Sequence, residues 1–170
     1  MATLKISDLS VGDWVSFDTA YLTVEGDDIA TAFVKKLQQS ARIKSILGDQ
    51  ELIFAEVETE DDFGTIYLKM EHIRPIPITA EILEKNGFTR SSGEFPIYEY
   101  TTLLGKMLRK TTVSLNHPYS YIVCRIEDTS KELHEYDRIT VNSSVERTPI
   151  HIHDLQHALR LAGVDKEINL

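Results

Sequence analysis

The sequence divides at the stretch Ile73-Arg74-Pro75-Ile76-Pro77-Ile78-Thr79. Two prolines at alternate positions hold the backbone extended and remove two amide donors, so this stretch is predicted to be an edge strand or a linker. Thr79 is a favourable N-cap residue for a short helix, Ala80 to Asn86, which Gly87 ends. We therefore predict two units, residues 1–78 and 79–170.

The first unit is predicted to be a small SH3-like β-barrel of short strands. Gly12-Asp13 is a turn that leads into an alternating strand, in which Val15 and Phe17 share one face. Gly48-Asp49-Gln50 separates two β-favouring runs and predicts a hairpin. Between these elements, residues 28–40 place apolar side chains at helical spacing, which predicts a short helical insert.

The second unit is predicted to be an α+β layer that ends in a helix. We expect this helix at Asp154 to Ala162, stopped by Gly163, with Leu155 and Leu159 on its buried stripe and Ala158 and Leu161 beside it. The strands are expected at Phe95–Tyr100, Leu103–Leu108, Thr111–Asn116, Tyr119–Ile126 and Asp137–Asn142, the second and third of them paired around Arg109-Lys110. The predicted fold class is therefore β-rich α+β, a barrel followed by an α+β unit with a C-terminal helix.

Composition excludes several classes of protein. The chain has 170 residues, 42% of them hydrophobic and 26% charged, as soluble globular proteins do. Its net charge is 18 − 27 = −9, which disfavours a general nucleic-acid surface or binding to an anionic membrane. A single cysteine excludes an internal disulfide, and the first residues lack a signal-peptide pattern. We expect a soluble, cytoplasmic protein.

Three of the six histidines cluster in Ile150-His151-Ile152-His153-Asp154-Leu155-Gln156-His157. Residues 153–157 differ by one substitution from the zincin pattern H-E-x-x-H, in which two histidines bind zinc and a glutamate activates water. A metal-dependent hydrolase is therefore one interpretation, centred on His153, Asp154 and His157, with His151 or Glu167 completing the site. A structural or adventitious metal ion, zinc for example, held by His151, His153 and His157 is another. Asp154 is one methylene shorter than that glutamate, so a plain strand-to-helix junction, with Asp154 at the helix N-terminus, is the interpretation we favour.

Two further features have simple explanations. Cys124 alternates with Ile122 and Ile126 and is predicted to be a buried core thiol rather than a nucleophile. The small basic cluster of Lys106, Arg109 and Lys110 is expected at a hairpin tip, and it leaves nucleic-acid association as an alternative function.

The aromatic residues suggest recognition. Tyrosines on a sheet offer contact area together with a polar group, and Trp14 follows a turn of the predicted barrel. We therefore predict a non-enzymatic binding or assembly module, without catalytic residues or an obligatory cofactor, that contacts a protein or peptide partner through Trp14, Tyr98 and Tyr121.

Both ends of the chain and the stretch between the two predicted units resemble a known family. The residues that carry this resemblance are Ile6–Val15, Ile73–Leu83, Lys85-Asn86-Gly87-Phe88 and His153–Gly163. They resemble a family of small uncharacterised proteins found in Bacteroidetes and their mobile elements. The resemblance implies an N-terminal SH3-like barrel followed by an α+β unit. Because that family has no assigned activity, the resemblance implies no catalytic residue.

Overall fold

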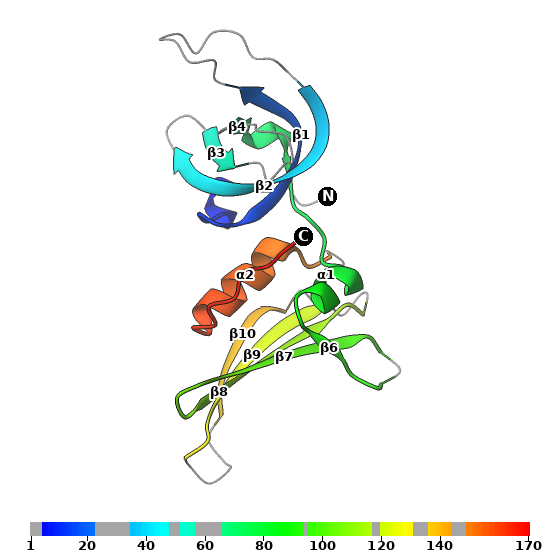
Figure 1. The fold of residues 1–170 in the computed structure, drawn as a ribbon, viewed down its shortest axis with the longest axis vertical. Coiled ribbons are helices and arrows are strands. Elements are labelled where there is room, and N and C mark those ends of the chain that lie inside the picture. Colours follow the sequence, from blue (N-terminus) through cyan, green and yellow to red (C-terminus); the bar gives the residue numbers. More distant parts are fainter. Residues whose placement is uncertain are drawn as a thin grey trace. The chain divides into compact units, whose positions relative to one another are not determined.

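The chain forms two compact units, Met1–Ile76 and Pro77–Leu170 (Figure 1). The boundary between them falls within the proline-containing stretch at which the sequence divides. The structure is a computed structural model that describes residues 5–22, 35–47, 52–56, 66–93, 95–116, 120–130, 136–143 and 149–170. The fold is β-rich α+β, with two antiparallel sheets and a C-terminal helix. None of the helices described is long and apolar enough to cross a membrane.

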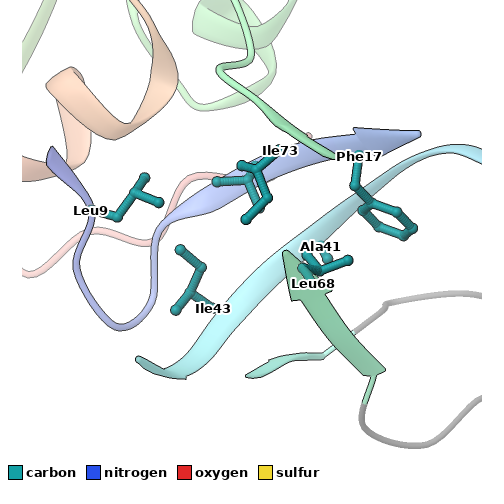
Figure 2. Packing of buried hydrophobic residues seen from close by; sticks show 7 residues of the cluster. Leu9, Phe17, Ala41, Ile43, Leu68 and Ile73 are labelled. Atoms are coloured by element: carbon teal, nitrogen blue, oxygen red, sulfur yellow. The ribbon is translucent and has the colours of Figure 1, made fainter. Parts of the chain in front are cut away.

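The first unit contains one sheet with strand order β2-β3-β4-β1-β5 and an additional pairing of β2 with β1. Its elements are η1 (Ile6–Asp8), β1 (Trp14–Leu22), β2 (Lys35–Leu47), β3 (Leu52–Glu56), β4 (Ile66–Lys69), η3 (Met70–His72) and β5 (Ile73–Arg74). Val15 and Phe17, which alternation places on one face of β1, are both buried in the core. Figure 2 shows this core, formed by Leu9, Val15, Phe17, Ala41, Ile43, Leu68 and Ile73.

One prediction for this unit is wrong. Residues 35–40 of the expected helical insert belong to β2, where Gln39 lies opposite Phe17 and Lys36 lies opposite Thr19 of β1. Pairing with a long neighbouring strand outweighs the weak helical periodicity of these residues. Residues 28–34 of the insert lie outside the described residues. The SH3-like closure of the sheet stays a prediction.

The second unit contains a sheet with strand order β10-β9-β8-β7-β6. Its elements are α1 (Ala80–Lys85), β6 (Thr89–Arg90), β7 (Ile97–Leu104), β8 (Met107–Ser114), β9 (Tyr121–Asp128), β10 (Tyr136–Ser143) and α2 (Ile152–Leu161). Thr79 Oγ1 accepts a hydrogen bond from Ile82 N at 3.3 Å, and Gly87 has a φ of 74°, so both predicted ends of α1 are confirmed.

Helix α2 covers one face of this sheet (Figure 1). The Cys124 thiol of β9 lies 3.6 Å from the carbonyl oxygen of Ala158, and Arg109 Nε of β8 donates to the carbonyl oxygen of Ala162 at 2.6 Å. Leu155 and Leu159 are buried as predicted, whereas Leu161 is 64% exposed and does not join the stripe. The guanidinium therefore binds the end of α2, where helix carbonyls lack partners within the helix.

The hairpin between β7 and β8 turns four residues earlier than the sequence predicts, so the expected pairing around Arg109-Lys110 is wrong. Leu104 lies opposite Met107, so Gly105 and Lys106 form the turn, and Gly105 has a φ of 61°. Arg109 and Lys110 lie inside β8 and not at a tip. A glycine at positive φ is the stronger turn signal, because other residues adopt that conformation only at a cost.

The last residues of the chain run back over α1. Asn86 Nδ2 donates to the carbonyl oxygen of Asn169 at 2.7 Å, and Asn169 N donates to Asn86 Oδ1 at 2.8 Å. The Lys166 ammonium lies 4.6 Å from the centre of the Tyr100 ring, and Ile168 is buried. The tail therefore contributes to the core of the second unit.

Replacing Arg109 should destabilise the second unit. Arg109→Met removes the hydrogen bond to Ala162 and should lower the free energy of unfolding by about 2 kcal/mol, as loss of a charged hydrogen bond does. Lys110→Met, a control one residue away, removes a partly exposed ion pair with Glu99 and should cost about 0.5 kcal/mol. Urea unfolding followed by circular dichroism measures both. Equal losses in the two variants would show that Arg109 does not hold α2.

Candidate functional site

Two of the three aromatic residues predicted to contact a partner, Trp14 and Tyr98, are buried. Trp14, in the first unit, is 5% exposed, and Tyr98 is 2% exposed. Tyr98 lies opposite Val113, which lies opposite Ile122, whereas Tyr121 is the next residue along β9 and therefore points to the other face. Trp14 and Tyr98 are packing residues with little surface for a partner, so this part of the prediction is not retained. Tyr121 is half-buried on the face away from α2.

The histidine stretch forms the junction that leads into α2. His151 is the N-cap residue, in extended conformation, and it forms an isolated β-bridge with Pro77. The amide of Ile78 donates to the carbonyl oxygen of Ile150 at 3.1 Å. This hydrogen bond fixes the extended segment that precedes α2. His153 and Asp154 follow in the first turn of the helix, so backbone contacts hold all three side chains in place.

His151, His153 and Asp154 form a compact cluster in which one ligand atom of each residue lies within 4.8 Å of the others. One carboxylate oxygen, Oδ2, lies 3.5 Å from His151 Nδ1, and the other, Oδ1, lies 3.5 Å from His153 Nε2. The two imidazole rings stack with their centres 5.5 Å apart and their planes 5° from parallel. His153 is 5% exposed, and the other two residues are half-buried.

Asp154 also holds the start of α2. Its Oδ2 accepts a hydrogen bond from the backbone amide of His151 at 2.8 Å. Burial raises the pKa of this carboxyl, but the hydrogen bonds from the His151 ring and amide and the charges of both imidazoles outweigh burial, so the pKa is lowered. The carboxylate is therefore an anion at neutral pH, next to the positive end of the helix dipole, as the favoured sequence interpretation expects.

The cluster differs from the zincin-like arrangement suggested by the sequence. The ring of His157 meets that of His153 edge-on, with centres 6.1 Å apart, and Glu167 is exposed. Neither residue joins His151, His153 and Asp154, whose ligand atoms all lie within 4.8 Å of one another. The combination of His151 with His153 and Asp154 requires a strand to end and a helix to begin between them, which periodicity alone does not reveal.

The basic cluster is largely used within the chain. Arg109 binds the end of α2, and Lys110 Nζ lies 2.8 Å from Glu99 Oε1. Lys106 is the exposed residue of the three and sits in the hairpin turn. The chain therefore lacks, at this position, the set of available cations that nucleic-acid binding requires.

Sequence reasoning missed a second candidate site, the outer edge of β7. Strand β6 pairs with β7 only at Tyr98 and Glu99, and Ser91 N donates to the carbonyl oxygen of Ile97. Because backbone polar groups of successive residues point to opposite sides of a strand, those of Thr101 and Leu103 also point to this edge. Within the described ranges, no strand pairs with them there.

Exposed leucines flank this edge. Leu103 is 60% exposed and Leu104 is 61% exposed, and they point to opposite faces of the sheet. Thr101 is also exposed, and Lys106 follows at the end of the strand. Unpaired backbone groups beside apolar side chains are the features of a sheet edge that accepts an added strand.

Comparison of the chain with protein-family models, with curated proteins and with solved structures finds no match. The resemblance to the Bacteroidetes family therefore stays an expectation, and the function has to be inferred from the geometry described above.

Cys124 should be unreactive in the folded protein. It is 1% exposed, burial raises its pKa although a hydrogen bond with Thr111 lowers it in part, and the reactive species is the thiolate. Reaction with a chromogenic disulfide reagent should be slower than in guanidinium by roughly a hundredfold or more, the factor set by an opening free energy of about 3 kcal/mol. Ser92→Cys, at an exposed position, is the matched control and should react quickly. Rapid reaction of Cys124 would contradict its assignment to the core.

Proposed function

We propose that the chain is a non-enzymatic binding module whose second unit captures an extended segment of a protein partner along the edge of β7. The observation that carries the proposal is the pair of outward-pointing backbone positions, Thr101 and Leu103, on an edge without a neighbouring strand among the described residues. An added strand gains main-chain hydrogen bonds there, which is a recurring mode of peptide recognition.

The side chains around the edge define the chemistry of the partner. Leu103 and Leu104 offer apolar surface on the two faces, so alternating apolar side chains of an extended segment would cover them. Lys106, at the end of the strand, complements a carboxylate of that segment. The proposed partner is therefore an extended segment with alternating apolar residues and an acidic residue near one end.

The SH3-like barrel of the first unit and a cytoplasmic location are parts of the same proposal. The strand pattern of residues 1–76 supports the first, and the single cysteine supports the second. Barrels of this kind usually present a binding surface, which agrees with a role in recognition.

The two alternative functions have less support. A zincin-like hydrolase needs its carboxylate to act as a general base toward bound water, whereas Asp154 accepts the His151 amide and lies between two imidazoles. Nucleic-acid association needs available cations, and two of the three in the basic cluster have intramolecular partners.

A proline at the open edge should abolish partner binding. The probe is a peptide selected from a random phage-displayed library panned against the full chain. Thr101→Pro removes the amide that faces the partner but none that faces β8, and prolines are tolerated on edge strands. It should weaken the peptide at least about tenfold, the equivalent of one hydrogen bond of about 1.4 kcal/mol. Fluorescence anisotropy of the labelled peptide measures the dissociation constants.

Thr101→Ser is the matched control, because it keeps the amide and the size of a small hydroxyl residue, and it should bind as the wild type does. Circular dichroism checks that both variants fold. If no peptide is enriched, or if Thr101→Pro binds as tightly as Thr101→Ser, strand addition at β7 is not the function of this surface.

A further inference from the structure

We propose that His151, His153 and Asp154 form a binding site for one divalent transition-metal ion, with zinc as the best-fitting ion. This inference is independent of the peptide-binding edge. The cluster lies at the start of α2, and none of its residues belongs to β7 or to the β7–β8 turn. It also differs from the hydrolase interpretation, because it uses Asp154 as a ligand and leaves His157 out.

The distances fit the ligand set of a small metal site. Zinc bonds of about 2.1 Å to nitrogen or oxygen place neighbouring ligand atoms of a tetrahedral site about 3.4 Å apart. Each histidine here has one ring nitrogen 3.5 Å from a carboxylate oxygen of Asp154, His151 through Nδ1 and His153 through Nε2. All three ligand atoms lie within 4.8 Å of one another. The two rings are stacked nearly parallel, so binding requires them to rotate until both in-plane lone pairs point to the ion.

The local structure already fixes the ligands. The bridge between His151 and Pro77 and the hydrogen bond from Ile78 to Ile150 hold the segment that carries the first histidine. The first turn of α2 carries the other two ligands, and His153 is 5% exposed. Ligands held in this way lose little conformational freedom on binding, which favours affinity.

The helix cap does not prevent Asp154 from acting as a ligand. Its Oδ2 accepts the His151 amide, but each carboxylate oxygen has two lone pairs, so the carboxylate can bind an ion and keep its half of the capping box. The His151 ring nitrogen has one lone pair, so it exchanges its own half of the capping box for the bond to the ion. Two imidazole nitrogens with one carboxylate favour zinc and its neighbours over calcium or magnesium, which prefer sets of oxygen ligands. Three protein ligands leave a fourth position for water or for a group from a partner.

A bound ion would join the segment before α2 to the first turn of that helix. Because the ligands come from both sides of the junction, the ion binds the folded state and not the unfolded chain, and it should therefore raise the melting temperature. The expected role is that of a structural clamp at the start of α2.

Zinc binding by the full-length, untagged chain tests the proposal. The protein is freed of metal with a chelator and titrated with zinc in competition with a chromogenic indicator, and we expect about one ion per chain. His151→Asn keeps a good N-cap residue, and Asp154→Asn keeps an oxygen for the His151 amide, so both should fold. Each should bind zinc at least about a hundredfold more weakly, because loss of a mere hydrogen-bond partner of a ligand already costs about 10–100-fold.

His157→Asn is the matched control, since it removes a histidine of the same helix that lies outside the cluster, and its affinity should stay within about threefold of the wild type. Cobalt-loaded wild type should show the intense visible absorption of a tetrahedral site, a readout that needs no variant. The proposal fails if the wild type binds no zinc at micromolar concentrations, if His157→Asn loses as much affinity as His151→Asn, or if Asp154→Asn binds as the wild type does.

Discussion

The second unit depends on α2, which is held by polar contacts at both of its ends, to the sheet at one end and to the segment before α1 at the other. At the C-terminal end, Arg109 of β8 binds the carbonyl oxygen of Ala162. At the N-terminal end, Asp154 accepts the His151 amide, and His151 in turn bridges Pro77. An antiparallel sheet with one apolar face needs such a cover, and here the cover is fixed by polar contacts at its ends as well as by burial of its apolar stripe.

The histidine–aspartate cluster follows from this attachment, whereas the open edge of β7 follows from the length of β6. The bridge to Pro77 fixes His151 immediately before the first turn of α2. Two histidines and a carboxylate therefore lie close together where the extended segment leads into the helix. Backbone donors and acceptors lie in the plane of a sheet, so a partner can reach unpaired ones only at an edge. Strand β6 contains only Thr89 and Arg90 and ends before the outer half of β7 is covered. The short β6 is thus the reason that Thr101 and Leu103 remain available.

The sequence predicted the features that depend on local chemistry. Thr79 and Gly87 bound α1, Gly163 follows α2 at a φ of 64°, and alternation placed Val15 and Cys124 in the cores. Prediction from the sequence failed where pairing with a distant segment of the chain decides the conformation. Residues 35–40 are a strand because β1 lies beside them, and the length of β6, which opens the edge of β7, has no periodic signal. For the cluster, the sequence indicated His151 and His153 but paired them with His157 instead of Asp154 as the third metal ligand. The cluster combines an extended residue with residues of a helix, which a single periodicity does not describe.

Amide hydrogen exchange along β7, followed residue by residue by NMR, tests the account most directly. In an antiparallel hairpin closed by Leu104 and Met107, the amides of Thr102 and Leu104 face β8, and those of Thr101 and Leu103 face outward. The account predicts slow exchange at the first pair and fast exchange at the second. Slow exchange at Thr101 and Leu103 would show that another segment of the chain already pairs with this edge, which would contradict an open binding site.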